Sequence, residues 1–228
     1  MRLRTLPGAL AAGLVLCLTY PAHAAEAPSA PPSPSVQATA TAEPVTNQEM
    51  LPALLAKMSA VNSGLRTYEA SITVQVTMHT FPYLNPTLTG HVYWSRPDRS
   101  AVVFDTLPVL ANQFKKVYPR VEAPSQWTAL YVVSLISPDH VRLVPRKHGR
   151  IDHLDVAANP DGTVASMHWY YNDGGDVELH QTFALVSGRL LVTAQHGTVD
   201  LPSYKGVIQA AFSGYKINVK IPDTVFAS

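Results

Sequence analysis

The sequence predicts a mainly β domain (an α+β fold), in which a strongly curved antiparallel sheet or barrel follows one amphipathic helix. Three observations predict this fold. Apolar residues recur at helical spacing before Gly64. Apolar and polar residues then alternate without a break over residues 68–79. Shorter alternating segments, separated by turn sequences, continue almost to the end of the chain.

The predicted helix begins near Thr46, where "TNQE" matches a capping box. Pro52 is tolerated only near a first turn, so Asn47 is an alternative cap. Gly64 is a natural stop. The result is a helix of about four turns, whose apolar stripe must pack on something apolar. The stripe consists of Leu51, Leu54, Leu55, Met58, Val61 and Leu65.

The alternation over residues 68–79 predicts a long strand with one buried and one solvated face. The segment "YLNPTL" then makes a turn, and "TGHVYWSRP" returns as the second strand. Turn sequences at Asn159, Asn172, Ser187 and Leu201 separate later segments, so seven or more antiparallel strands are expected. Further strands are predicted at Ala101 to Phe104, Trp127 to Ile136, His140 to Val144, Arg150 to Val156, Val164 to Tyr171, Val177 to Leu185, Leu190 to Gln195 and Val207 to Val219.

A second short helix is predicted over residues 107–118, where Leu110 and Phe114 share an apolar face. Two short helices do not easily fill the inside of a wide, curved sheet. Either the sheet closes on its own side chains, or an apolar cavity remains for a ligand.

The N-terminus has the pattern of a signal peptide over residues 1–24. Arg2 and Arg4 precede an apolar run, and Ala22 and Ala24 form a cleavage pattern. Leu16 precedes Cys17, which does not suit a lipoprotein signal, so cleavage after Ala24 is expected; a retained anchor is the alternative. Residues 25–45, rich in Pro, Ala and Ser, are predicted to be a flexible linker, and residues 46–228 a single domain.

Composition argues against several classes of function. Of 17 basic residues, removal of Arg2 and Arg4 leaves 15, against 16 acidic residues, so no basic surface for nucleic acid is expected. No catalytic motif or nucleophile elbow is present, and neither a catalytic residue nor a cofactor is predicted. The histidines lack metal-site spacing. His168 and His180 could face each other across a hairpin, but solvated strand histidines are the favoured interpretation and no metal is predicted.

Four segments, taken in order, resemble the LolA/LolB-type periplasmic carriers of lipoproteins and lipids. They are the helix "LLAKMSAVNSGL", the strand "YEASITVQV", the element "GHVYWSRPD" and the hairpin "NPDGTVASM". The third matches that family's Gly-x-Leu-aromatic-x-x-Arg-Pro element at identical spacing. The likeness spans about Gln48 to Met167 and fades toward the C-terminus.

The resemblance implies an unclosed antiparallel β-barrel with an N-terminal helix and a short helical lid, which holds acyl chains inside. It implies a soluble periplasmic protein with a lipid or acylated lipoprotein as cargo, and transport components of the inner or outer membrane as partners. Arg96, followed by Pro97, would latch the lid at the cavity mouth; blunting a strand end at the surface is the alternative role. The expected cavity and lid residues are Met58, Ile72, Val74, Val76, Met78, Val92, Trp94, Leu110 and Phe114.

One stretch departs from the family pattern. Its Leu-x-Asp-Gly-x-x-x-aromatic segment is missing, and "FDTLPVLANQFKKVYPRVEAPSQW" stands in its place. Three other functions therefore stay open beside the carrier. They are an envelope sensor or scaffold that binds a protein partner, an enzyme built on a barrel, and a structural domain with a filled core.

Overall fold

The computed structural model describes residues 47–81, 83–96, 99–105 and 121–226. The helices are α1 (Asn47–Ala60), α2 (Pro124–Leu130) and the 3-10 helix η2 (Asp223–Phe226). The strands are β1 (Thr67–Met78), β2 (Thr87–Ser95), β3 (Arg99–Phe104), β4 (Tyr131–Ser137), β5 (His140–Pro145), β6 (Ile151–Ala158), β7 (Val164–Tyr171), β8 (Asp176–Val186), β9 (Arg189–Leu201) and β10 (Tyr204–Ile217).

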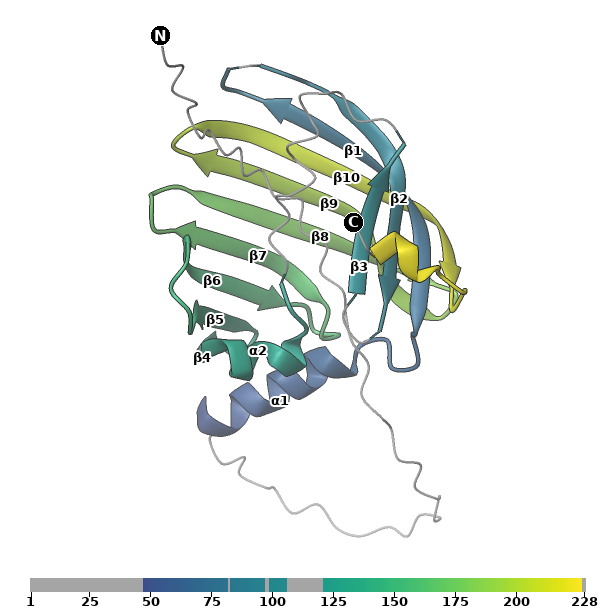
Figure 1. The fold of residues 1–228 in the computed structure, drawn as a ribbon. Helices are drawn as coiled ribbons and strands as arrows, with labels where there is room; N and C mark the ends of the chain where they lie inside the picture. Colours follow the sequence, from purple (N-terminus) through teal and green to yellow (C-terminus); the bar gives the residue numbers. More distant parts are fainter. Residues whose placement is uncertain (1–46, 82, 97–98, 106–120, 227–228) are drawn as a thin grey trace, which may run out of the picture.

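The ten strands of the described residues form one antiparallel sheet in the order β3-β2-β1-β10-β9-β8-β7-β6-β5-β4. The chain builds one edge with β1–β3, crosses to the opposite edge at β4, and returns strand by strand until β10 pairs with β1. The sheet curves strongly, and β3 and β4 remain its two edges (Figure 1). The predicted unclosed, curved antiparallel sheet is confirmed.

Helix α1 lies across one end of the strands (Figure 1). It contacts α2 and β4, and the turn that follows it is tied to the β8–β9 hairpin. There the Asn62 side-chain amide donates to the Leu190 carbonyl at 2.6 Å, and the Leu190 N–H donates to Asn62 Oδ1 at 2.9 Å. Asn62 has a φ of 58° and Gly64 a φ of 87°. This left-handed turn ends α1 close to the predicted stop.

The core lies between α1, α2 and one face of the sheet, here called the inner face. Alternate residues of each strand supply it, such as Ile72 and Val74 of β1 and Leu154 and Val156 of β6. The other face, here called the outer face, carries the polar residues of the same strands. The period of two seen in the sequence therefore separates a buried face from a solvated face.

One predicted strand was partly wrong. Residues 127–130 belong to α2, and the strand starts only at Tyr131. Pro124 stands in the first turn of α2, where its missing N–H costs no helical hydrogen bond. Trp127 is 1% exposed, and its indole N–H donates to the Glu122 carbonyl at 2.6 Å. Tertiary packing of the indole thus outweighs the β propensity of this segment. The helix predicted over residues 107–118 lies outside the described residues.

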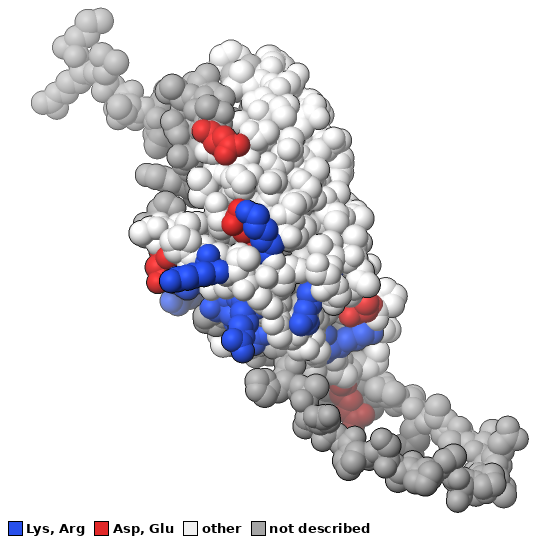
Figure 2. All heavy atoms as spheres, turned by 90° about the vertical axis from the view of Figure 1, so that its right-hand side faces the viewer, with Lys and Arg blue, Asp and Glu red and all other residues white. Residues whose placement is uncertain are grey.

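On the face shown in Figure 2, basic residues gather in the lower half beside a few acidic ones, and the upper part is largely uncharged apart from an acidic group at its left edge. Arg99 pairs with Asp223 of η2 at 2.6 Å and stacks on Phe226, which fixes η2 against β3. Within the described ranges, no helix is long and apolar enough to cross a membrane.

Candidate functional site

The inner face at β1 and β2 brings together the residues predicted to contact cargo. Ile72, Val74 and Met78 of β1 are buried, and Val76 is partly buried. On β2, Val92 and Trp94 have no exposed surface. The register explains this grouping, because Val92 lies opposite Ala70 and Trp94 lies opposite Tyr68. Side chains at these positions share one face of adjacent strands and pack side by side.

Met58 joins the same cluster from α1 and is 1% exposed. The described residues thus place a helix, two strands and all of their predicted contact residues except Met78 in one apolar cluster or packed against it. Leu110, Phe114 and Pro97, which belonged to the predicted lid and latch, lie outside the described residues. Six of the seven predicted cavity residues that the structure describes form a packed surface, whereas Met78 is buried near the end of β1 outside this cluster. A ligand could reach these six residues only if the cluster opened.

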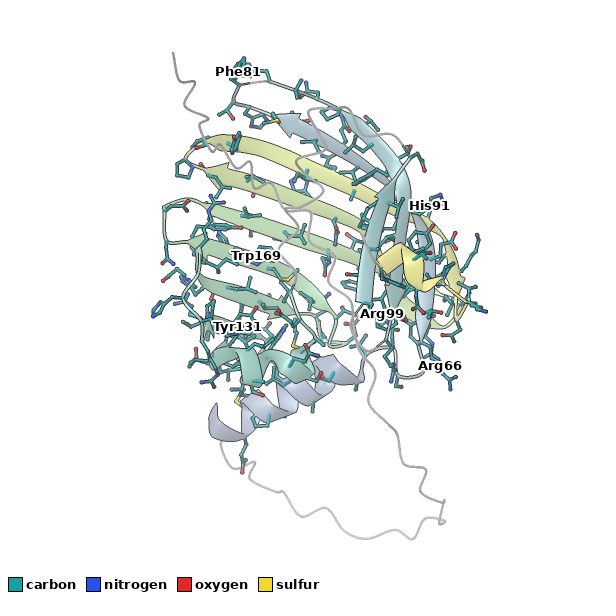
Figure 3. The ribbon with its side chains drawn as sticks, viewed as in Figure 1. Arg66, Phe81, His91, Arg99, Tyr131 and Trp169 are labelled. Carbon is teal, nitrogen blue, oxygen red and sulfur yellow. The ribbon has the colours of Figure 1, made fainter. Side chains whose placement is uncertain are left out.

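Aromatic residues outside the predicted contact set extend this cluster, among them Trp169, which was expected to line or rim an apolar interior. Tyr68 stacks on Trp94 with ring centroids 5.8 Å apart, and Tyr215 meets Tyr68 edge to face at 5.4 Å. The Tyr215 hydroxyl donates to the Val192 carbonyl, and burial raises the pKa of Tyr215. Trp169, at 1% exposed, contributes from β7 toward the α2 end of the sheet (Figure 3). Tyr68 and Trp169 hold inward positions in the alternating pattern of their strands, which was the available signal. Tyr215 breaks the alternation of β10, at an irregularity in its pairing with β1, so periodicity could not have found it.

Arg96 follows directly after β2 and is half-buried. Its Nε donates to the Leu65 carbonyl at 3.1 Å, and its backbone N–H donates to the Arg66 carbonyl at 2.9 Å. Both acceptors lie in the connection between α1 and β1. Arg96 Nη2 is buried and has no hydrogen-bond partner among the described residues. The guanidinium therefore joins the end of β2 to the segment that follows the helix.

Two polar side chains also point to the inner face. Gln181 of β8 is 8% exposed and Gln195 of β9 is 3% exposed, and the two residues are directly opposite each other. Neither stood out in the sequence, although Gln181 occupies an inward position between Leu179 and Phe183. Both amides are thus buried beside the apolar residues of the described inner face.

The histidines of the described ranges are on the outer face or in turns. His168 is opposite Glu178, and His180 is opposite Ser166, so the suggested facing of His168 and His180 was wrong by two residues. His168 instead pairs with Asp176, and Tyr170 hydrogen-bonds to its other ring nitrogen at 3.1 Å. In the described part of the chain, no group of three metal-binding side chains comes together.

A pocket of about 430 Å³ lies over β1, β2, β8, β9 and β10. Most of its lining residues belong to the outer face, whereas Gln195 and Ala210 are buried residues at inner-face positions. Its walls combine small residues with threonine, glutamine and histidine, and none of its lining side chains is a carboxylate or a lysine or arginine. It therefore differs from the apolar site predicted for the inner face. The lining residues are Thr73, Gln75, Thr87, His180, Thr182, Ala194, Gln195, His196, Gln209, Ala210 and Ala211.

Solved structures from three bacteria share this fold at low sequence identity. A DUF1329 family protein from Desulfovibrio piger is 11% identical, with a TM-score of 0.58 over 79% of this chain and 96% of its own. A LolA superfamily protein from Nitrosomonas europaea is 14% identical, with a TM-score of 0.54 over 81% of this chain and 99% of its own. An outer membrane lipoprotein-sorting protein domain from Vibrio parahaemolyticus is 9% identical, with a TM-score of 0.54 over 79% of this chain and 95% of its own.

These likenesses show that the chain has a LolA-like fold. The expected fold resemblance is thereby confirmed at the level of structure. Comparison of the sequence with protein-family models and with curated proteins finds no match.

Proposed function

We propose that this protein is a periplasmic carrier that binds the acyl chains of a lipid or lipoprotein for transport across the cell envelope. The observation that carries the proposal is the apolar cluster of the inner face, formed by β1, β2 and α1 within a LolA-like sheet. The names of two solved structures support it, since one is a LolA superfamily protein and the other an outer membrane lipoprotein-sorting domain. A signal peptide cleaved after Ala24 would deliver the chain to the periplasm.

Binding of an acyl chain is driven by removal of its methylene groups from water. Each buried methylene stabilises the complex by about 0.8 kcal/mol. The opposing cost is the opening of a cluster in which Trp94, Val92 and Met58 are almost fully buried. A long chain offsets this cost more readily than a short one. The proposal therefore favours cargo with long acyl chains over small apolar molecules.

Arg96 is the proposed latch of this site. Its hydrogen bond to the Leu65 carbonyl holds the end of β2 against the connection from α1. A hydrogen bond from a charged group contributes about 1.5–3 kcal/mol, enough to control opening at this end of the sheet. Pro97 would stiffen the backbone beyond the arginine, and Leu110 and Phe114 would belong to the lid.

Arg96→Leu should raise the rate of lipid exchange by about ten-fold, the equivalent of about 1.4 kcal/mol, because the variant keeps an apolar stem and loses the bond to Leu65. Exchange is measured by transfer of a fluorescent fatty acid from the protein to vesicles, alongside the melting temperature. Arg66→Leu is the matched control, because Arg66 is exposed and only its backbone joins these contacts. Lower stability with an unchanged exchange rate would show that Arg96 only supports the strand end.

Native mass spectrometry of the gently purified mature protein, followed by solvent extraction and lipid analysis, tests the function itself. A stoichiometric acylated species would support the carrier and identify its cargo. A bare protein that also fails to bind an added fluorescent fatty acid would exclude the carrier, and the sensor or scaffold would then become the leading candidate. The intact mass of the same sample shows whether cleavage occurs after Ala24.

A further inference from the structure

The inner face contains one side-chain amide without a partner. Gln181 is 8% exposed, and in the described part of the chain neither its Nε2 nor its Oε1 has a hydrogen-bond partner. A buried amide that makes no hydrogen bond is destabilising, and native structures contain few of them. Such a group calls for an explanation, and a missing ligand is one.

The position of Gln181 in the sheet makes it part of the proposed cargo surface. It lies opposite Gln195, which is opposite Ala210, which in turn is opposite Val74 of the predicted contact set. This row crosses the inner face from β8 to β1. Leu179 and Phe183 flank Gln181 on its own strand and belong to the apolar cluster or pack against it.

The surroundings of Gln181 select a neutral partner. Among the described residues, the buried polar ones are Ser95, Thr163, Gln181 and Gln195, and none of them is ionised. The buried Nη2 of Arg96 lies beyond the end of β2, and β1, β10 and β9 separate that strand from β8, so no buried ion adjoins Gln181 to balance a charged ligand group. An ionised carboxylate or phosphate placed here would be uncompensated. A carboxamide offers two N–H donors and one acceptor oxygen, which suits the carbonyl of an ester or amide.

We propose that Gln181 binds the carbonyl group by which an acyl chain is linked to its cargo, an ester or an amide. This inference rests on the proposed carrier function and deepens it, because it specifies acylated molecules over plain hydrocarbons. The amide N–H of Gln181 donates to the linkage carbonyl, while the acyl chain lies against the apolar residues of the same face. The cost of burying an unsatisfied amide in the empty protein is offset when the cargo is bound.

A competition between two lipids tests this assignment. Vesicles that contain equal amounts of dipalmitoyl phosphatidylglycerol and its ether analogue, dihexadecyl phosphatidylglycerol, are incubated with the mature protein, and bound lipid is counted by native mass spectrometry. The two lipids share headgroup and chain length and differ in the carbonyl groups. We expect the wild type to prefer the ester lipid about three- to ten-fold, the effect of one neutral hydrogen bond.

Two variants assign this preference to a residue. Gln181→Leu should bind both lipids about equally, and its lipid-free form should melt at a higher temperature than the wild type, because an unsatisfied amide is removed. Gln209→Leu is the matched control on the exposed outer face and should keep the wild-type preference.

The possible outcomes separate the two proposals. If wild-type protein binds both lipids equally, or if Gln181→Leu keeps the ester preference, the assignment of Gln181 is wrong and the carrier function stands. Equal binding is also the result expected if a buried water satisfies the amide. If neither the wild type nor either variant binds either lipid, the carrier function is wrong, and the assignment of Gln181 is wrong with it. The ratio of bound ester lipid to bound ether lipid in the wild type tests the assignment of Gln181 even if Gln181→Leu does not fold.

Discussion

Arg142 and Asp155 form a two-pronged ion pair on the outer face. Nε and Nη2 of the guanidinium donate to the two carboxylate oxygens of Asp155, each at 2.7 Å, between neighbouring positions of β5 and β6. The hydrogen bond from Arg142 holds the pKa of the Asp155 carboxyl below its usual value, although partial burial opposes it. The ionised form is therefore favoured in the folded state, and the pair stabilises the protein only while Asp155 is charged.

Asp155→Asn should remove a stabilisation that is present above about pH 4, the ordinary pKa of an aspartate. The contribution disappears as the pH falls through the lowered folded-state pKa. Because the pair is partly solvated, the difference in free energy of unfolding at pH 7 should be at most about 1 kcal/mol. Urea unfolding of both proteins between pH 7 and pH 2.5 measures it. A difference that persists undiminished at the lowest pH would contradict this account.

Asp173→Asn serves as the control for that experiment. Asp173 also pairs with an arginine, Arg150, at 3.0 Å, but both side chains are substantially exposed. They lie in different connections, Arg150 just before β6 and Asp173 just after β7. Its substitution should change stability little at any pH. Together the two variants separate the effect of a well-formed pair from the general loss of a carboxylate.

At the scale of elements, Gly90 determines how closely β3 approaches β2. A Cβ atom at this position would lie 2.3 Å from the Val103 carbonyl oxygen and 2.7 Å from the Phe104 Cα. Both are backbone atoms and cannot move aside as a side chain does. Gly90 also pairs with Ile72 on the other side, so the glycine lies between the long central strand and the edge strand.

Gly90→Ala should therefore destabilise the fold by about 1–3 kcal/mol, the usual effect of overpacking. The loss should be concentrated at the β2–β3 pair, and hydrogen exchange at β3 amides should accelerate more than at β7. Gly149→Ala is the control, since no heavy atom lies within 4 Å of its added Cβ. Equal effects of the two substitutions would show that chain entropy, and not the close approach, is responsible.

At the scale of the whole molecule, the pairing of β1 with β10 joins the two halves of the sheet. The strands β1–β3 come from the start of the domain, and β4–β10 from the rest. The partners are far apart in sequence, as in the pair Tyr68 and Ile217. This central seam therefore depends on contacts that no local segment can make alone.

A mature chain that ends at Leu201 should lose its cooperative thermal transition, because β1 and β9 both lose the partner β10. Circular dichroism during heating is the measurement. A chain that starts at Thr46 is the companion variant. If residues 25–45 are a linker, it should melt like the mature protein. A sharp transition in the chain that ends at Leu201 would show that β10 is dispensable.

The sequence by itself determined the element types and the buried face of most strands. The alternation over residues 68–79 predicted β1 and the inward side of Ile72 and Val74, both confirmed, because a period of two is a local property. The apolar spacing before Gly64 likewise predicted α1. These signals arise from neighbours in the chain and need no knowledge of the partner strand.

Only the tertiary structure decided strand order, register and the exceptions to local preference. The pairing of β1 with β10, and of His168 with Glu178, depends on turns and long-range contacts that periodicity does not encode. Residues 127–130 became helical because Trp127 is anchored in the core. Gln181 became a candidate ligand contact only when its burial and lack of partners were visible, since an inward glutamine looks like any other interruption of an apolar pattern.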